Sequence, residues 1–317
     1  MLEKTLSIIK PDGVSRNLMG DVIGRLERII GAPVICEEAD ILDRDRLAGI
    51  LARYPIRAAI HFAALKAVGE SAERPLDYFQ TNISGLIGLM QAMQAAGVFR
   101  MVFSSSATVY GVPEVLPIPE TAPLGYTNPY AYTKLACERI IEQAEVADPR
   151  WTVGRLRYFN PAGAHPSGLI GEDPNDTPNN LMPYVAKVAA GELPEIRVFG
   201  DDYDTPDGTG VRDYIHVEDL AEGHVRSLAA LDATGRSHLV NLGTGRGYSV
   251  MEMIAAYSRS CGRDLPWPIV PRRPGDIPTC YADPTRAAEL LDFRTTRDLD
   301  EMCQSSWNWI QVGAGRN

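Results

Sequence analysis

The sequence predicts an α/β fold, in which a doubly wound parallel sheet is joined to a second, smaller α/β domain. Short apolar runs rich in β-forming residues alternate along the chain with stretches of helical spacing. Such alternation is typical of βαβ units, in which helices cover a parallel sheet. The chain has 317 residues, 45% of them hydrophobic and 23% charged, which is enough for one large or two ordinary domains with a core.

Each element follows from its local pattern. The runs expected to form buried strands are 58–62, 100–106, 151–159 and 237–243, and helical spacing marks 72–97, 129–147, 181–191 and 217–231. Two segments, 160–180 and 200–210, are rich in Gly, Pro, Asn or Asp, so we expect neither helix nor strand there. Loops of this length are usually functional. We therefore expect a Rossmann-like sheet in the first half, interleaved with a loop-rich, ligand-binding second half.

Composition excludes several classes of function. A net charge of −10 disfavours non-specific binding of nucleic acid. No apolar run approaches the ~20 residues of a membrane span, and no export signal is visible at the start. The five cysteines are scattered and never form a CxxC pair, which predicts a cytoplasmic protein without disulfides or a zinc site.

The strongest chemical signal is a Tyr and a Lys four residues apart in YAYTK. On a helix, Tyr130 and Lys134 share one face, where an ammonium would lower the pKa of a phenol and prepare it as a base. Upstream, a predicted strand ends in three serines, 104–106, at the sheet edge where ligands bind. A Ser, a Tyr and a Lys together suit hydride transfer at an alcohol carbon. The alternative is a chance Tyr–Lys pair and an ordinary serine-rich loop.

With these residues the chain resembles the extended short-chain dehydrogenase/reductase family, and within it the UDP-glucose 4-epimerases, over about residues 26–310. The blocks that carry the resemblance are HFAALKAVGES (61–71), FSSSATVYG (103–111), NPYAYTK (128–134), LRYFNPAGAHPSG (156–168), NNLMPY (179–184), DGTGVRDYIHVEDLA (207–221), NLGTGRGYSV (241–250) and PRRPGD (271–276). The resemblance implies an NAD-binding Rossmann-like domain over 1–160 and a mainly UDP-sugar-binding domain over 161–317. It also implies a homodimer paired through the helices of 72–97 and 129–147.

The implied reaction is an isomerisation of UDP-glucose and UDP-galactose at C4 through a 4-keto sugar. By the resemblance, Tyr130 takes the proton of the 4-hydroxyl, Ser106 binds the reacting oxygen, and Lys134 holds the nicotinamide ribose. The implied substrate-binding residues are Ser106, Asn160, Asn180, Leu181, Arg212, Tyr214, Arg273, Asp276 and Cys280. Among these, Arg212 and Arg273 would meet the phosphates, for which guanidinium groups are suited. Without the resemblance, both arginines would be read as partners in surface ion pairs.

Cys280 stands where the family often has a bulky Tyr beside the sugar C2. A smaller side chain leaves room there. We therefore expect UDP-N-acetylhexosamines to be substrates as well.

The cofactor site departs from the family pattern. The resemblance assigns NAD contacts to Asp40, Ile41, Phe62, Ala63, Ala64, Lys66, Asn82, Tyr130, Lys134 and Tyr158, with Ala64 where the family usually has Gly. The glycine-rich GxxGxxG loop that receives the pyrophosphate is absent. Charge-assisted hydrogen bonds are each worth about 1.5–3 kcal/mol, so losing several would lower NAD affinity by orders of magnitude. The alternative to an active epimerase is thus a UDP-sugar-binding protein with weak or no activity.

Residues 1–25 resemble a different family, the nucleoside diphosphate kinases. TLSIIKPDGVSRNLMGDVIGRLE is similar to their first strand, a KPD turn with a phosphate-contacting Lys, here Lys10, and the first helix. The NxxHGSD block that carries the phosphorylated His of that family does not occur in the chain. We therefore expect this segment to supply only a strand and a helix to the sheet, which would make the chain a chimera of the two families.

Other candidate sites are expected to be structural. His165, His216 and His224 lack the spacing of metal ligands and are predicted to shape loops or core, so no metal is expected. The GTGRG turn at 243–247 follows a strand and precedes a helix, but it comes too late in the chain to open a cofactor domain. The resemblance to the epimerases implies that this turn lies on the substrate side.

Overall fold

The computed structural model describes residues 5–6, 35–173, 178–273 and 275–314. Apart from Thr5 and Leu6, the segment similar to nucleoside diphosphate kinases, including Lys10, lies outside the described residues. The chain divides into two compact units, and each contains segments from both halves of the sequence. The first unit comprises 1–111, 124–157 and 227–239, and the second comprises 112–123, 158–226 and 240–317.

A five-stranded sheet organises the first unit. Its strands run in the order β1 (Thr5–Leu6), β2 (Ala58–His61), β3 (Arg100–Ser104), β4 (Thr152–Tyr158) and β9 (His238–Leu242), the last of which begins in this unit. The pairs β1–β2, β2–β3 and β3–β4 are parallel. Since every strand from β2 on falls within a run expected to form one, the predicted Rossmann-like parallel sheet is confirmed.

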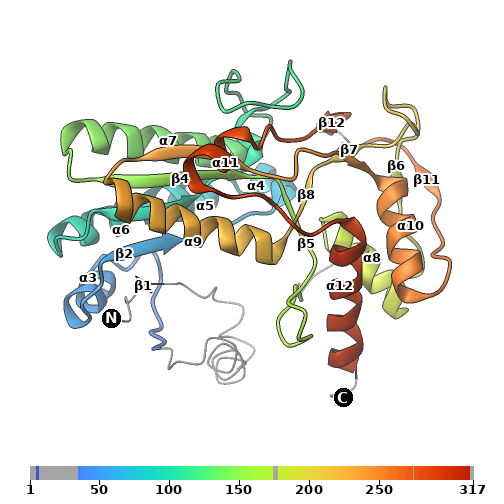
Figure 1. Ribbon diagram of the computed structural model, residues 1–317, viewed down its shortest axis with the longest axis horizontal. Coiled ribbons are helices and arrows are strands. Elements are labelled where there is room, and N and C mark those ends of the chain that lie inside the picture. The colour runs from blue at the N-terminus through green and yellow to red at the C-terminus, as the bar shows by residue number, and fades with distance from the viewer. Residues whose placement is uncertain (1–4, 7–34, 174–177, 274, 315–317) are drawn as a thin grey trace. The chain divides into compact units, whose positions relative to one another are not determined.

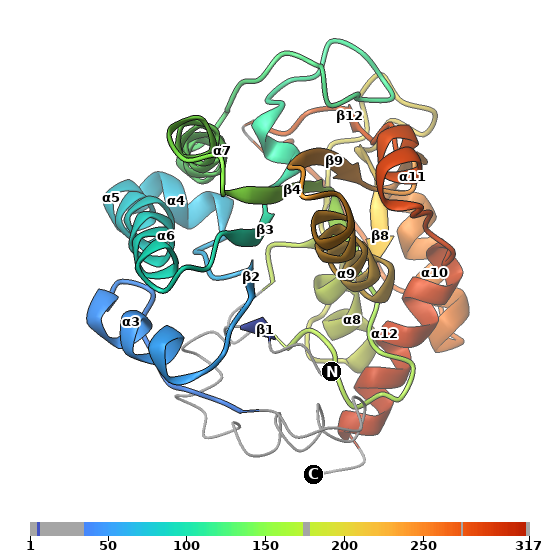
Figure 2. The same cartoon turned by 60° about the vertical axis from the view of Figure 1, so that its left-hand side comes forward.

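Helices connect these strands and cover the sheet (Figure 1). They are α3 (Arg44–Arg53), α4 (Val68–Glu73), α5 (Pro75–Tyr78), a π-helical turn (Phe79–Ser84), α6 (Gly85–Ala95), a 3₁₀ turn (Ala107–Val109), α7 (Pro129–Ala147) and α9 (Val217–Thr234). In Figure 2, α3, α6 and α7 lie on one side of β2–β4. A Cβ on Gly154 of β4 would lie 2.2 Å from Ser227 Oγ of α9, so the absence of a side chain there lets helix and strand approach.

The helical prediction for 72–97 needs a correction. Helix formation begins earlier, at Val68, and is interrupted at Arg74, because Pro75 cannot donate the hydrogen bond that would continue α4. The chain then passes through the π-helical turn before α6 begins. By contrast, α7 spans the predicted 129–147, with Pro129 in its first turn and the Asn128 side chain accepting a 2.9 Å hydrogen bond from Ala131 N.

The described part of the second unit contains short strands, residues 217–226 of α9 and four further helices. Three small sheets pair β5 (Asn160–Ala162) with β8 (Tyr214–His216), β7 (Val211–Arg212) with both β10 (Tyr248–Ser249) and β12 (Thr279–Cys280), and β6 (Val198–Phe199) with β11 (Ile269–Val270). The helices are α8 (Leu181–Ala190), α10 (Val250–Cys261), α11 (Thr285–Leu291) and α12 (Leu299–Ala314). The strand β5 corrects the expectation that 160–180 contains none, because Asn160 N donates to Asp213 O and begins the pairing.

The helices α8, α10 and α12 enclose the core of this unit, in which Val185, Met253 and Met302 are fully buried. A capping box of Ser249 and Glu252 starts α10 directly after β10. The strand–turn–helix predicted around GTGRG is therefore present, and it belongs to the second unit. Among the described residues, no helix is both long and apolar enough to cross a membrane.

Candidate active site

The Tyr–Lys pair lies against the serine-rich end of β3, as the sequence predicts. Tyr130 and Lys134 occupy successive turns of α7, and both are buried. The Lys134 ammonium donates a 2.7 Å hydrogen bond to the Ser104 carbonyl, and the Tyr130 phenol is hydrogen-bonded to Ser106. The Ser106 hydroxyl also accepts a 3.0 Å bond from Thr108 Oγ1. The three residues expected to carry the chemistry therefore meet at one place.

The acidity of Tyr130 differs from the expectation. Burial raises the pKa of its phenol, and the hydrogen bond with Ser106 offsets this only in part. The Lys134 ammonium lies 6.0 Å from the centre of the Tyr130 ring and is directed at the Ser104 carbonyl. The expected lowering of the Tyr130 pKa by Lys134 is therefore not found, and burial raises this pKa because an apolar site disfavours the phenolate.

A second set of buried polar residues, which the sequence did not reveal, lies directly behind this pair. Glu138 continues the four-residue spacing of Tyr130 and Lys134 along α7, and its carboxylate accepts a 2.5 Å bond from Ser105 Oγ. Arg157 of β4 donates to both oxygens of that carboxylate, at 2.9 and 2.6 Å. Glu138 and Arg157 are 1% and 2% exposed. Continuing the spacing by one more turn would have identified Glu138, but no local pattern points to Arg157.

The predicted NAD contacts at the next strand end follow β2, and Asn82, the predicted nicotinamide-side contact, is bonded to their loop. Asn82 is buried, and its amide accepts from Leu65 N at 2.8 Å and donates to Leu65 O and Thr133 Oγ1, both at 3.0 Å. It thereby fixes the loop that contains Ala63, Ala64 and Lys66. Phe62, at the start of this loop, is 39% exposed. A fixed loop with partly accessible residues at the end of a parallel strand fits a dinucleotide.

The predicted adenine-side residues are arranged differently from the expectation. Residues 35–40 form no strand, so Asp40 does not stand at a strand end. Its carboxylate instead accepts a 2.8 Å bond from Leu42 N, which stabilises a turn before α3. Ile41 is buried, and its side chain lies 3.0 Å from where a Cβ of Gly85 would stand, so it packs on α6.

In the second unit, two predicted phosphate-binding arginines share one carboxylate. Asp276 accepts a 3.2 Å bond from Arg273 Nε, and its other oxygen lies 4.0 Å from Arg212 Nη2. Both arginines also act on Tyr214, whose pKa burial raises to about 12 while the two positive charges oppose the shift. Tyr214 is 4% exposed and belongs to the core. Two guanidinium groups thus converge on one partly exposed place, as an anionic ligand requires.

Cys280 stands beside Arg212 because β12 pairs with β7 at that position. Burial raises the pKa of its thiol to about 11, so the side chain is a small neutral group. Asp213, which the sequence did not single out, holds this region together. Its fully buried carboxylate accepts from Thr244 N, Thr244 Oγ1, Gly245 N and Ala282 N, at 2.7–3.1 Å.

The remaining predicted ligand residues lie at the ends of elements. Asn160 begins β5, and Leu181 is the first residue of α8. Asn180 precedes that helix as its N-cap, is exposed, and makes no side-chain capping bond. Tyr158 ends β4, with its ring 6.0 Å from that of His224.

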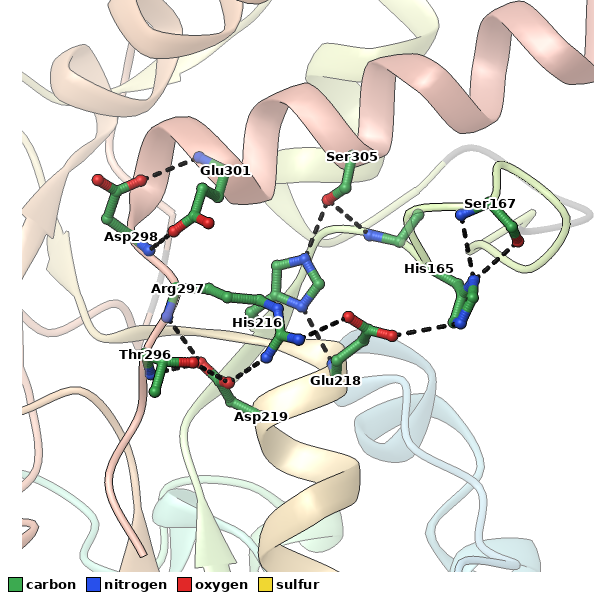
Figure 3. Close-up of polar contacts among 11 residues, drawn as sticks. His165, Ser167, His216, Glu218, Asp219, Thr296, Arg297, Asp298, Glu301 and Ser305 are labelled. Carbon is green, nitrogen blue, oxygen red and sulfur yellow. Dashed lines mark hydrogen bonds and ion pairs between the residues drawn. The ribbon is translucent and has the colours of Figure 1, made fainter. Parts of the chain in front are cut away.

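The histidines have structural partners (Figure 3). His216 Nδ1 accepts from Glu218 N at 3.1 Å, so its Nε2 donates to Ser305 Oγ at 3.0 Å. Ser305 Oγ in turn accepts from Ala164 N. His165 lies 3.3 Å from Glu218, and no group of three or more potential metal ligands occurs among the described residues. These contacts and the burial of His216 and His224 agree with the expectation that the histidines shape loops or core.

Comparison with known proteins identifies the family of the chain. Residues 13–243 match the model of the NAD dependent epimerase/dehydratase family. The chain is 53% identical to the UDP-glucose 4-epimerase of Bacillus subtilis (strain 168) over 310 residues, which cover 98% of this chain and 91% of that protein.

Two solved structures are similar at 50% identity. One is the UDP-glucose 4-epimerase of Stenotrophomonas maltophila with bound NAD and formylated UDP-arabinopyranose, with a TM-score of 0.91 and coverage of 93% of this chain and 88% of that one. The other is the UDP-glucose 4-epimerase of Bifidobacterium longum in complex with NAD+ and UDP, with a TM-score of 0.88 and coverage of 92% and 87%.

Proposed function

Because the chain belongs to the NAD dependent epimerase/dehydratase family, we propose that it is a UDP-glucose 4-epimerase that interconverts UDP-glucose and UDP-galactose through a 4-keto sugar. The observation that carries the proposal is the convergence of Tyr130, Lys134 and Ser106 at the end of β3. A phenol, a hydroxyl and an ammonium are together what proton transfer at a secondary alcohol requires.

In this proposal, Tyr130 removes the proton of the sugar 4-hydroxyl and later returns it to the 4-keto oxygen. Ser106, already hydrogen-bonded to Tyr130, orients that oxygen. Lys134 supplies positive charge beside the phenol, which favours the phenolate against the cost of burial. Bound NAD would supply the hydride acceptor and donor for C4 of the sugar. The net reaction consumes no cofactor.

We assign NAD mainly to the first unit and the UDP-sugar mainly to the second. Phe62, Ala63, Ala64 and Lys66 would contact NAD after β2, and Asn82, which fixes their loop, would lie on the nicotinamide side. Lys134 would hold the nicotinamide ribose, and Tyr158, the first residue of its segment of the second unit, would also contact NAD. Asp40 and Ile41 remain the proposed adenine-side residues, although they occupy a turn and not a strand end.

UDP would be anchored by positive charge in the second unit. Arg212 and Arg273 are held on either side of Asp276, so both are oriented before an anion arrives. The pairing leaves a net positive charge for the diphosphate, since two cations share one carboxylate. Asn160, Asn180, Leu181 and Tyr214 would contact the rest of the sugar nucleotide. A fixed anchor on UDP is needed because the 4-keto hexose must turn over between the two hydride transfers.

The small Cys280 side chain supports a further element of the proposal, namely that UDP-N-acetylhexosamines are substrates too. A thiol with a raised pKa is neutral, and it occupies much less volume than a tyrosine. Space beside the sugar C2 would then accept an acetamido group.

The proposal is tested by measuring NAD content and epimerisation on the same preparation. Purified protein is expected to contain NAD, detected by absorbance after denaturation, and to convert UDP-glucose to UDP-galactose. Protein that binds UDP in calorimetry, lacks NAD and stays inactive when NAD is added would instead support a UDP-sugar-binding protein without activity. That alternative is motivated by the missing GxxGxxG loop.

Two further parts of the proposal concern the protein's state in the cell. We propose a homodimer that uses the first unit's helices, because Leu76 and Val146 are 76% and 80% exposed. Sedimentation velocity at several concentrations tests this. We also propose a cytoplasmic location, in line with five cysteines that form no disulfide in the structure.

A further inference from the structure

Three residues at four-residue intervals on α7 each engage one residue of the serine-rich strand end. Tyr130 is hydrogen-bonded to Ser106, Lys134 donates to the Ser104 carbonyl at 2.7 Å, and Glu138 accepts from Ser105 Oγ at 2.5 Å. The contacts of Lys134 and Glu138 therefore hold Ser104 and Ser105, the two residues that directly precede Ser106. The proposed catalytic mechanism uses Tyr130, Lys134 and Ser106 but leaves Glu138 without a role.

Arg157 determines the charge of this arrangement. Its guanidinium binds both carboxylate oxygens of Glu138 and lies 4.9 Å over the Tyr110 ring. Glu138 is also four residues from Lys134 on the same helix face, a spacing at which an ammonium and a carboxylate can meet. With Arg157 in place, the carboxylate is neutralised by a partner on β4. The Lys134 ammonium is then left to bind the Ser104 carbonyl.

We infer that Glu138 and Arg157 form a positioning pair for proton transfer: they hold Ser105 so that Ser106 stays beside Tyr130, and they keep the carboxylate from capturing Lys134. This inference rests on the proposed epimerase function for its kinetic consequences. The geometric part depends only on the contacts among α7, β3 and β4. A buried ion pair adds little net stability compared with apolar residues, so its presence here is better explained by positioning than by folding.

Tyr78 on α5, with its hydrogen-bond partner Glu70 on α4, and Ser106 after β3 interact with Tyr130. His61 on β2 and Cys137 on α7 instead interact with Lys134. Burial raises the pKa of Cys137 to about 12, and burial together with Lys134 lowers that of His61 to about 3, so both are neutral near pH 7. Glu70 and Lys134 are unchanged in the variants below. Any difference among these variants therefore reports on Glu138 and Arg157.

Removing the charge of Arg157 and removing that of Glu138 are expected to shift the pH profile of kcat in opposite directions. In Arg157→Met, the unneutralised carboxylate draws Lys134 away and disfavours the phenolate. The limb on which kcat rises with pH is then expected to move up by about one pH unit. In Glu138→Gln, the remaining guanidinium favours the phenolate, and the limb is expected to move down by a similar amount. The double variant Glu138→Gln/Arg157→Met carries neither charge and is expected to return to the wild-type position.

The experiment measures the pH profile of kcat for these variants with UDP-glucose. The matched control is Arg139→Met, which removes an arginine from the exposed pair with Glu142 on the same helix and is expected to leave the profile unchanged. If Arg157→Met does not fold, Glu138→Gln and the double variant still test the direction in which the pH profile shifts. Unshifted profiles in folded single variants, or shifts in the same direction, would overturn the inference, because a purely structural role predicts no dependence on the sign of the charge.

A second readout does not need activity. The Tyr130 phenolate is titrated by near-ultraviolet difference absorbance, taking Tyr130→Phe in each background as the reference. The same opposite shifts of its midpoint are expected. If the wild-type protein fails to epimerise UDP-glucose but these midpoints move as stated, the proposed function is wrong and the positioning pair is correct. Unmoved midpoints would reject the pair whatever the activity.

Discussion

The Lys134 ammonium donates a 2.7 Å hydrogen bond to the backbone carbonyl of Ser104, and this contact connects α7 to the end of the central strand β3. Because both residues are buried, the bond is shielded from water and holds the ammonium in a defined position. It also places the positive charge at the strand end, where the ammonium nitrogen lies 6.0 Å from the centre of the Tyr130 ring. The predictions below start from this arrangement.

Replacing the proposed base removes the reaction but not the fold. Tyr130→Phe deletes one hydroxyl, and a positioned general base contributes about 10²–10⁴-fold, so kcat for UDP-glucose is expected to fall by at least about 100-fold. The control is Tyr132→Phe, two residues along the same helix and 39% exposed, for which an unchanged kcat is expected. Near-equal activities of the two variants would show that Tyr130 is not the base.

Asp213→Asn is expected to weaken substrate binding more than turnover. The amide NH₂ replaces one carboxylate oxygen and cannot accept hydrogen bonds. The donors bound to that oxygen, which are either the two of Thr244 or Gly245 N and Ala282 N, then lose their acceptor. Such a loss costs about 1–3 kcal/mol of unfolding free energy. Since Arg212 and Cys280 border Asp213, KM for UDP-glucose should rise severalfold while kcat changes little. A variant with lower stability but wild-type KM would confine Asp213 to a structural role.

Cys280→Tyr is expected to select between sugars. A tyrosine beside C2 should lower kcat/KM for UDP-N-acetylglucosamine by about tenfold or more relative to UDP-glucose, because an overfilled pocket rejects the larger substrate. The measurement is competition between the two sugars, with product ratios read by chromatography. Cys261→Ser, at the end of α10, is the matched control. No detectable turnover of UDP-N-acetylglucosamine by an active wild-type preparation would already contradict the proposal.

Stability is expected to decrease as the pH falls below about 6.5. Burial lowers the pKa of His224 from 6.5 to about 4, so the unfolded chain binds this proton at a higher pH than the folded one. By linkage, the contribution is fully present above pH 6.5 and is lost progressively down to pH 4, by about 3 kcal/mol in all. The pKa of His61 is also lowered, so this residue likewise reduces the stability of the folded protein as the pH falls.

This pH dependence is measured from urea unfolding midpoints at pH 7.5 and pH 5. His224→Gln should be less stable at pH 7.5 but should lose less between the two pH values. An equal slope in His224→Gln and the wild-type protein would mean that His224 does not titrate as stated.

Local patterns in the sequence determined the framework of the site. Apolar runs predicted β2, β3, β4 and β9, and the four-residue spacing of Tyr130 and Lys134 placed both on one face of a helix that runs from Pro129 to Ala147. Secondary structure of this kind depends on residues close in the chain, so a sequence determines it directly. The short strand β5 depends on hydrogen bonds to another segment and was not predicted, whereas the interruption at Arg74 was missed although its cause, Pro75, is local.

Only the tertiary structure decided which charges act on Tyr130. Glu138 and Arg157 are 19 residues apart, Ser105 and Glu138 are 33 apart, and Asp213 and Ala282 are 69 apart, so no local pattern connects them. Burial, which raises the pKa of Tyr130 where the spacing alone predicted a lower one, is likewise a property of the packed molecule. The sequence by itself determined which side chains could do the chemistry. Packing decided their electrostatic surroundings, because desolvation and ion pairing require segments that are distant in the chain to meet.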